Sequence, residues 1–476
     1  LQAFADGTYA KAYDADGSAH SQEVVDTLAS GGLYSTPADL SRFATMLMNR
    51  GAYASRRILS AASVREMGTD QTVGEMRPVL YKAARYGLGW DSVSQPGLLK
   101  AGFTAWMKGG DSADYHAGFV VVPGKKLAAV VQGVAPIDSG KAETLCERIL
   151  LHALKDRGAL RRLPRLVPAV APRVKKATAS QLRAIQGYWA GNSMLFKAES
   201  AEGSQAVTVS TLGQDGAWHE MTRGLRLRVD GRFHRKGAPA SVWTTTAAGR
   251  RYLINRAPSG NGFCFDNLPL AQKLAAGEPL SKAWASRVGG WWLGVNEYQS
   301  STFWDDSGPL LSLADVPGLG GYLLVNTVGY GMQILDPGED DEIALTFLQI
   351  PGFGSRDMND LTVEEVDGDE WLRYGTTLYR PLQSVPVLTA GANVVTIGDE
   401  GHAEWRTLDS PARVAIAAGS LWRAYDAGMA VIGSGTTYPA EVEVPAGGFV
   451  CLFAPDGTEI GVTVTPSAGV GAGPSL

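Results

Sequence analysis

Apolar residues recur at helical spacing in two stretches of the first 160 residues. The earlier stretch follows Thr36-Pro37-Ala38-Asp39, which offers an N-cap, a proline at the first helical position and an acidic residue for a capping box. We expect a helix from there to Gly51, where a left-handed residue can end it. Its apolar stripe is Leu40, Phe43, Ala44, Leu47 and Met48. The later helix is expected before Gly158, on a stripe of Ala142, Leu145, Cys146, Ile149, Leu150 and Ala153.

Two β-rich runs lie between these helices. They extend from Phe119 to Val122 and from Leu127 to Val134, and the turn Pro123-Gly124-Lys125-Lys126 joins them. Two such runs across a Pro-Gly turn predict a β-hairpin. The segment Trp106-Met107-Lys108-Gly109-Gly110-Asp111 leads into its first strand. It combines a cation with two glycines that allow another backbone to come close.

The region after residue 158 has a different pattern. Residues 159–178 are rich in proline and basic residues, which predicts an extended linker. Its charge could attract an anionic surface, but a solvated linker is the interpretation we favour. Beyond it, Gly187-Tyr188-Trp189-Ala190-Gly191 recurs as Gly290-Trp291-Trp292-Leu293-Gly294, each after a short helical segment.

Each copy of this motif begins a stretch of alternating polar and apolar residues. β-rich closing runs follow at residues 251–256 and 376–380, with turns at Asp230-Gly231 and Asp367-Gly368. We expect two consecutive antiparallel barrels or sandwiches of lipocalin-like size. The paired aromatic residues could stack on sugars, but we favour a role in plugging the end of each barrel.

The predicted fold class is therefore a partial α+β domain, an antiparallel sheet with flanking helices, followed by antiparallel β-barrel or sandwich domains. The expected boundaries are 1–158 for the α+β domain, 159–178 for the linker, 179–280 and 281–384 for the two barrels, 385–465 for a small β domain and 466–476 for a flexible tail.

The order of motifs in the first 155 residues resembles one enzyme superfamily. Gly31-Gly32-Leu33-Tyr34-Ser35-Thr36-Pro37 is followed by Tyr86-Gly87-Leu88-Gly89-Trp90, then by Lys108-Gly109-Gly110, a strand and a closing helix. This order is similar to that of the serine β-lactamase and penicillin-binding superfamily, in particular its class C-like branch of D-aminopeptidases, D-Ala-D-Ala carboxypeptidases and esterases. The resemblance covers about a third of the chain.

The resemblance implies roles for the Lys108 segment. Lys108 would raise the positive potential of the pocket, the backbone N–H of Asp111 would form half of an oxyanion hole, and Gly109 and Gly110 would let a substrate backbone lie along the strand. Tyr115 and His116 fall where the family strand passes the pocket rim, as substrate-binding candidates or as ordinary strand surface. Two departures matter: Gly109 offers no hydroxyl, and Asp111 brings a negative charge that favours a neutral ester or amide over an anionic substrate.

The rest of the family's catalytic set is missing from these residues. No lysine has a serine three positions before it, and no tyrosine has an asparagine two positions after it. Ser259-Gly260-Asn261 fits a Ser-x-Asn pattern but comes after Lys108, against the family order, and we interpret it as a surface turn. A serine hydroxyl needs a neighbouring base to act as a nucleophile, so we expect this chain alone to be inactive.

Two classes of function remain open. The first is a serine hydrolase that acts through an acyl-enzyme on a small peptide, ester or amide, with its nucleophile in a missing N-terminal segment or subunit. The second is a non-catalytic binding or scaffold protein of the cell envelope that retains the pocket wall and the β domains. The family's usual location implies an extracellular or cell-envelope protein, with cell-wall material as a further candidate partner.

Composition narrows the remaining choices. The 476 residues contain 43 Lys and Arg against 48 Asp and Glu, a net charge of -5, which argues against a nucleic-acid partner. No apolar stretch reaches the length of a membrane span. Cys146, Cys264 and Cys451 are far apart, and we expect buried free thiols rather than a disulfide or metal site. No cofactor is expected.

Overall fold

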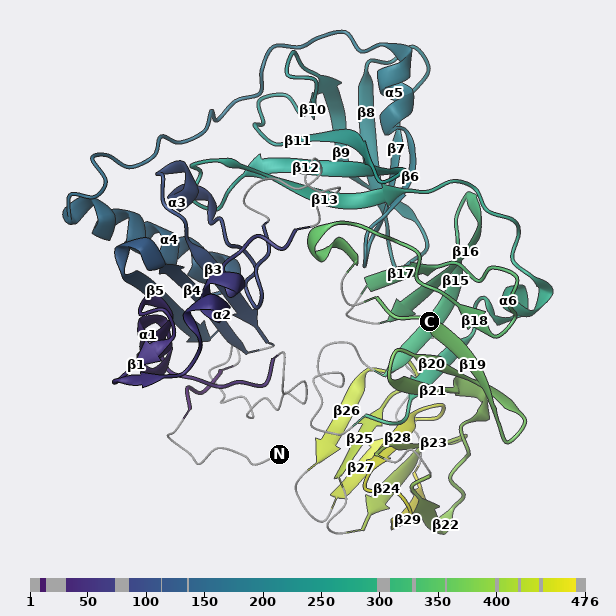
Figure 1. Ribbon diagram of the computed structural model, residues 1–476. Coiled ribbons are helices and arrows are strands. Elements are labelled where there is room, and N and C mark those ends of the chain that lie inside the picture. The colour runs from purple at the N-terminus through teal and green to yellow at the C-terminus, as the bar shows by residue number, and fades with distance from the viewer. Residues whose placement is uncertain are drawn as a thin grey trace. The chain divides into compact units, whose positions relative to one another are not determined.

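The computed structural model describes residues 9–13, 31–72, 85–112, 114–134, 137–297, 309–327, 331–355, 358–398, 402–417, 421–435 and 440–467. The chain divides into two compact units (Figure 1). Unit 1 comprises Leu1–Ala275 and Leu348–Asp357, and unit 2 comprises Ala276–Phe347 and Met358–Leu476. Among the described residues, no helix is both long and apolar enough to cross a membrane.

The first part of unit 1 is a small α+β domain. Its helices are α1 (Pro37–Met48), α2 (Ala61–Met67), α3 (Pro96–Lys100) and α4 (Ser139–Asp156), and β1 (Ala52–Tyr53) pairs with β2 (Arg56–Arg57). The predicted cap of α1 is confirmed, because the Thr36 hydroxyl accepts a hydrogen bond from the Asp39 N–H. Gly51 follows the helix with a φ of 92°. The α+β part of the expected fold class is therefore present in the described residues.

A three-stranded antiparallel sheet forms the centre of this domain. Its order is β3 (Trp106–Asp111), β4 (Tyr115–Val122) and β5 (Leu127–Val134), so the predicted hairpin is confirmed. Lys126 turns the chain with a left-handed φ of 49°. Register pairs Lys108 with Phe119 and Asp111 with His116. The Lys108 segment is thus part of the strand itself.

Helix α4 packs against the sheet through a face that differs from the predicted stripe. Leu145 and Ile149 are 45% and 50% exposed, whereas Glu147, Leu151 and Leu154 are buried. The predicted helix is confirmed, but the buried face of α4 is rotated relative to the predicted apolar stripe, toward Glu147, Leu151 and Leu154. The reason is that α4 also packs on α3 and on a loop from the following domain, which buries residues that a one-sided stripe would leave out.

The second part of unit 1 is a closed eight-stranded barrel. After α5 (Ala179–Ile185) come β6 (Gly187–Ala190), β7 (Leu195–Glu199), β8 (Ala206–Leu212), β9 (Trp218–Leu227), β10 (Phe233–His234), β11 (Ser241–Ala247), β12 (Arg250–Pro258) and β13 (Phe265–Lys273). β13 pairs with β6 and closes the barrel. The predicted closing run at residues 251–256 lies in β12, one strand too early. Trp189 fills the core and donates a hydrogen bond to the Ile185 carbonyl.

Unit 2 begins with a second eight-stranded sheet of the same plan. After α6 (Lys282–Arg287) come β14 (Trp291–Gly294), β15 (Leu310–Val316), β16 (Leu319–Thr327), β17 (Gly331–Leu335), β18 (Ile343–Ala344), β19 (Leu361–Val366), β20 (Asp369–Tyr374) and β21 (Thr377–Pro381). β14 pairs with β15 and β21 as β6 pairs with β7 and β13. A bridge between Asp336 and Leu345 brings the two edge strands nearly to closure. Trp292 is buried in this core, as the plug prediction requires, whereas Trp291 of the same pair is 42% exposed.

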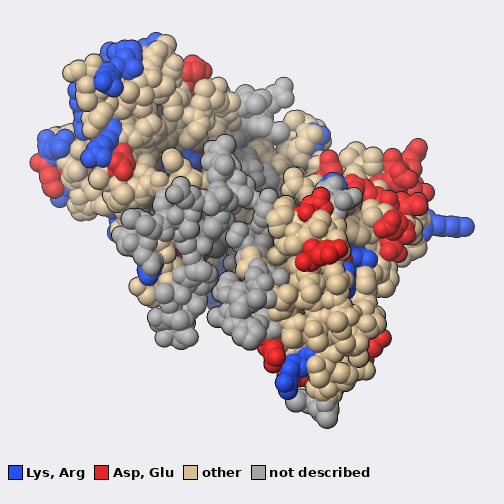
Figure 2. All heavy atoms as spheres, turned by 90° about the horizontal axis from the view of Figure 1, so that it is seen from below, with Lys and Arg blue, Asp and Glu red and all other residues tan. Residues whose placement is uncertain are grey.

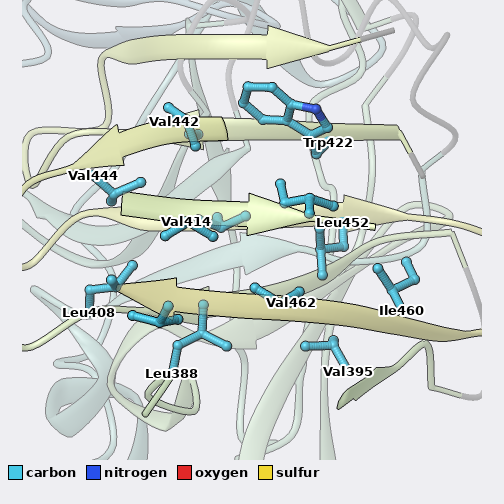
Figure 3. Close-up of a cluster of buried hydrophobic side chains, with 14 of the residues drawn as sticks. Leu388, Val395, Leu408, Val414, Trp422, Val442, Val444, Leu452, Ile460 and Val462 are labelled. Atoms are coloured by element: carbon cyan, nitrogen blue, oxygen red, sulfur yellow. The ribbon is translucent and has the colours of Figure 1, made fainter. Parts of the chain in front are cut away.

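The remainder of unit 2 is a sandwich of two four-stranded sheets. One has the order β22 (Gly391–Thr396), β29 (Glu459–Pro466), β24 (Ala412–Ile416) and β27 (Ala440–Val444), and the other has β23 (Glu404–Thr407), β28 (Phe449–Phe453), β25 (Leu421–Tyr425) and β26 (Val431–Gly435). Aliphatic side chains and Trp422 from both sheets fill the space between them (Figure 3). The three cysteines are buried and free, as expected.

Candidate active site

A large cleft in unit 1 gathers most of the residues that the sequence singled out. Its volume is about 1940 Å³, and its lining includes Lys108, Gly109, Gly110, Asp111, Tyr115 and His116. Residues from α1, α3 and α4 and from the β12–β13 loop complete the wall. The cleft therefore forms where the small α+β domain meets the first barrel.

Lys108 is fixed by an acidic partner that the sequence analysis did not identify. The Lys108 Nζ lies 2.9 Å from Asp91 Oδ2, and the same oxygen accepts a hydrogen bond of 2.9 Å from the Gly109 N–H. Asp91 directly follows the Tyr86-Gly87-Leu88-Gly89-Trp90 motif. This motif thus places a carboxylate that holds both the lysine and the start of the two-glycine strand segment.

The Asp111 side chain is occupied within the fold. Its carboxylate accepts hydrogen bonds from the Ser139 N–H at 2.8 Å and from the Ser139 hydroxyl, and it lies 2.7 Å from His116 Nδ1. Burial raises the pKa of Asp111, but the bonds from Ser139 and His116 outweigh it and hold the pKa below its usual range. Ser139 opens α4, so Asp111 fastens the end of β3 to the first turn of that helix.

Ser139, Asp111 and His116 are not a catalytic triad. In a triad the histidine lies between the serine and the carboxylate, so that it can take the hydroxyl proton. Here Asp111 lies in the middle, and both of the other side chains bond to it. The arrangement orients His116 but gives Ser139 no imidazole base.

Tyr115 connects β4 with the N-terminal segment that contains Ala10. Its hydroxyl donates a hydrogen bond of 2.7 Å to the Ala10 carbonyl, and its ring packs edge-on against Tyr34 at 5.6 Å. The side chain is partly buried at the cleft rim. Tyr115 and His116 are therefore both near the cleft, with contacts that fix their rings in place.

Glu143 on α4 is the most perturbed acid of the cleft. Burial is the main cause and, with the charges of Asp91 and Asp111, outweighs the effect of Lys108 and raises its pKa to about 7. A Cβ atom added at Gly109 would lie 2.3 Å from Glu143 Oε1. The Glu143 carboxyl thus occupies the space beside this position, which explains why residue 109 is a glycine.

A loop of the first barrel forms part of the cleft wall. Ser259, Gly260 and Asn261 make a turn between β12 and β13, as predicted. Gly260 is exposed, as expected of a surface turn, whereas Asn261 is only 4% exposed. Asn261 accepts a 2.6 Å hydrogen bond from Arg148 and donates one to Glu147. Its amide serves to dock the loop on α4.

Two further carboxyl groups lie under this loop. Glu147 is 2% exposed, and its carboxylate also accepts the Gly97 N–H at 2.8 Å; burial raises its pKa. Asp266 lines the cleft, and burial and the charge of Glu147 raise its pKa to about 6 despite Arg256. Asp266 Oδ1 has no hydrogen-bond partner among the described residues. This buried oxygen is an acceptor that the described residues leave without a donor.

The sequence analysis missed Asp91, Glu143 and Asp266. Asp91 had a local signal, since it adjoins a quoted motif, but its partner lies 17 residues away. Glu143 stands one residue from the predicted apolar stripe of α4. Asp266 comes from another domain, and no local pattern connects it with Lys108.

The family match found by comparison with known proteins covers only the first domain. Residues 2–139 match the family model described as Beta-lactamase. No curated protein matches the chain at a significant level.

Two solved structures show weak likeness. One, described as SurE with D-Leu, has 16% identity and a TM-score of 0.33 and covers 51% of this chain and 52% of its own, so this chain spans about half the length of that protein. The other, TolB from Acinetobacter baumannii, has 8% identity and a TM-score of 0.11 over 83% of this chain and 93% of its own. At these scores neither likeness supports a conclusion.

Replacement of Gly109 by alanine should destabilise the protein by about 1–3 kcal/mol, because the new methyl group meets the buried Glu143 carboxyl. The matched control is Gly110→Ala on the same strand, where a Cβ meets only the Ala117 Cβ at 3.9 Å. Urea unfolding gives the free energy of unfolding of both variants and of the wild type. The double variant Gly109→Ala, Glu143→Ala should recover most of the loss. Equal effects of the two single substitutions would contradict the proposed collision.

Glu143 should make the protein less stable as pH rises from 4.5 to about 7. In this window the unfolded chain has released the Glu143 proton while the folded chain keeps it, so the free energy of unfolding falls. The effect is at most about 3 kcal/mol, reduced by the partial solvent access of the group. Glu143→Gln should remove this part of the slope, whereas the exposed Glu202→Gln should not. The free energy of unfolding of each variant is measured by urea unfolding at pH 5, 6 and 7. The same dependence on pH for wild type and Glu143→Gln would exclude a raised pKa of Glu143.

Proposed function

Residues 2–139 belong to the serine β-lactamase and penicillin-binding superfamily, and on this premise we propose that the cleft is the substrate wall of an acyl-transfer hydrolase of the class C-like type. Its substrate is an amide or ester of a D-amino acid with a free amino group. The observation that carries this proposal is the acidity of the cleft, whose two lysines are both paired with carboxylates.

The cleft contains many more carboxyl groups than cations. Lys108 and Lys141 are its only lysines among the lining residues, and there is no arginine. The carboxyl side chains that line it are Asp39, Asp91, Asp111, Asp138, Glu143, Glu147 and Asp266. A cleft with one dominant sign of charge concentrates ligands of the opposite sign. Ammonium groups are therefore favoured over carboxylates.

Lys108 does not reverse this preference. Its ammonium group already has the Asp91 carboxylate at 2.9 Å, which offsets most of the potential that it would offer to an anionic substrate. The Asp111 carboxylate, in contrast, is taken up by Ser139 and His116. The sequence analysis attributed the bias against anions to Asp111. The geometry instead supports Asp91, which neutralises Lys108, and Asp266, which lines the cleft, as its source.

β3 offers the backbone side of such a site. Within the described sheet it is an edge strand, and Gly110 has open space around its Cα apart from Ala117. Met107 on this edge is already bridged to Ser92, and the Gly109 N–H bonds to Asp91, so an extended substrate would form main-chain hydrogen bonds at the Asp111 end of the strand. Lys108 and the Gly109 to Asp111 backbone then orient the scissile carbonyl, while Asp266 across the cleft receives the substrate ammonium group.

The acyl-enzyme step needs a serine and a base that these 476 residues do not supply in the family pattern. We therefore expect this chain to hydrolyse no nitrophenyl ester above the level of its heat-denatured control. The product of the whole reading frame is the matched sample, and a fluorophosphonate probe should label it on a serine of a Ser-x-x-Lys sequence. Absence of labelling despite such a sequence would overturn the hydrolase proposal and favour a binding protein.

Substrate charge is tested separately on the present chain by calorimetric titration. D-alaninamide, with its ammonium group, should bind at least about tenfold more tightly than N-acetyl-D-alanine, with its carboxylate, and neutral N-acetyl-D-alaninamide should lie between them. Asp266→Asn should reduce the preference for the amine, whereas Asp156→Asn on the exposed end of α4 should not. Tighter binding of the carboxylate ligand would overturn the substrate assignment without affecting the family assignment.

A further inference from the structure

The net charge of -5 conceals a strong separation of charge between the two units. Unit 1 contains 36 Lys and Arg and 23 Asp and Glu, whereas unit 2 contains 7 Lys and Arg and 25 Asp and Glu. The units thus have formal net charges of +13 and -18. On the face drawn in Figure 2, many of the Lys and Arg side chains gather in one region and many of the Asp and Glu side chains in another.

The positive charge of unit 1 is concentrated in one stretch of sequence. Residues 157–198 contain nine Lys and Arg and no Asp or Glu. Eight of these cations are exposed, and none has an ion-pair partner in the described parts of the chain: Arg157, Arg161, Arg162, Arg165, Arg173, Lys175, Lys176 and Arg183. Unpaired exposed cations at this density are unusual, because surface charges of both signs normally alternate.

This stretch is held against the unit rather than free in solvent. The Val167 N–H bonds to the Gly262 carbonyl at 2.8 Å, and the Arg165 carbonyl accepts the Lys100 ammonium at 2.9 Å. Further along, the Lys175 N–H bonds to the Leu227 carbonyl at 2.9 Å at the end of β9. The cations are therefore held in place by backbone contacts that leave their side chains available.

Barrel residues extend the same basic surface. The Arg173 carbonyl accepts the Val229 N–H at 3.0 Å, which places the connecting segment beside the β9–β10 hairpin. That hairpin presents Arg226, and Arg235 and Lys236 follow it directly; all three are exposed. We name the set Arg157, Arg161, Arg162, Arg165, Arg173, Lys175, Lys176, Arg226, Arg235 and Lys236 the basic strip.

We propose that the basic strip binds a linear polyanion that lacks bases, of the phosphodiester or polyphosphate type. The shape of the strip favours a linear partner. Residues 157–176 contain three prolines and form neither a helix nor a regular strand. A fully extended segment of this length would span roughly 65 Å. A small anion can meet only one or two of these cations, whereas a polymer can follow them.

The composition of the strip argues against a nucleic acid. Recognition of single-stranded nucleic acids relies on aromatic side chains on which bases stack. Residues 157–187 contain no Phe, Trp, Tyr or His, and Phe233 and His234, which precede Arg235 in the barrel part of the strip, are buried. The strip offers charge without a stacking surface, which suits a polymer recognised only by its backbone. This partner is distinct from the substrate of the cleft, whose charge has the opposite sign.

The test titrates the chain with inorganic polyphosphate at several salt concentrations. Wild type should bind with an affinity that falls steeply as salt rises, because each neutralised phosphate releases counterions. Arg173→Gln, Lys175→Gln, Lys176→Gln should weaken binding by about tenfold at 100 mM salt and make the slope of log K against log salt shallower by about 2. These side chains make no hydrogen bond among the described residues, so the fold should persist, as circular dichroism can verify.

The matched control removes three exposed cations of unit 1 outside the strip, Arg56→Gln, Arg65→Gln, Lys126→Gln, and should keep wild-type affinity within about twofold. No binding of polyphosphate by wild type at 50 mM salt would overturn the proposal. So would an equal loss in the control variant, which would indicate attraction by the whole unit. A single-stranded oligonucleotide with the same number of phosphates serves as the comparison. If it binds tenfold more tightly than polyphosphate, the partner is a nucleic acid and the proposal of a polyanion without bases is overturned.

Discussion

The close approach of α4 to the three-stranded sheet is the constraint on which the candidate site depends. A Cβ at Gly118 would lie 2.5 Å from the Glu143 backbone nitrogen, so helix and strand are in direct backbone contact there. This contact brings the first turn of α4 beside β3. Ser139 then reaches Asp111, and Glu143 reaches the space above Gly109. Gly109 and Gly118 are both required by this packing, whereas Gly110 is not, because a Cβ there would meet only the Ala117 Cβ.

Helix α4 also connects the α+β domain with the barrel. On its outer side Glu147 is buried between the start of α3 and the β12–β13 loop, where the Gly97 N–H and the Asn261 amide bond to it. Phe263 from the same loop packs among Leu98 and Leu150. A buried carboxylate is stabilised only when its oxygens have partners, so this loop and α3 must be in place together. The cleft wall therefore depends on a docking contact between domains.

The sequence predicted those features that local patterns determine. The cap of α1, the hairpin of β4 and β5, and the paired Trp motifs that begin both eight-stranded sheets all follow from residues close together in the chain. β13 was missed because Pro269 and a register shift interrupt its alternation. Asn261 was expected on the surface because its turn composition is typical of exposed loops, and only packing against α4 buries it.

The same limit explains the electrostatics of the cleft. The sequence motif contains one cation, Lys108, and one carboxylate, Asp111, and local sequence alone predicts that these two set the charge of the site. Asp111 turns toward α4, while Asp91, Glu143 and Asp266 come from three other segments. Whether a carboxylate lines a cleft depends on tertiary contacts between residues up to 175 positions apart in this chain, from Asp91 to Asp266. No composition-based argument can recover that placement.

The acidic cleft and the basic strip can coexist in one unit because electrostatic interactions in salt solution are short in range. The Debye length is about 8 Å at physiological ionic strength, so an exposed charge acts on ligands in its own neighbourhood and little beyond. The formal charge of +13 on unit 1 therefore does not make its cleft attractive to anions, since the carboxyl groups within the cleft determine the local potential. By the same reasoning, the formal charge of -18 on unit 2 does not by itself prevent polyanion binding by the basic strip of unit 1. Net charge describes the colloidal behaviour of a chain, whereas recognition follows the local sign of each surface.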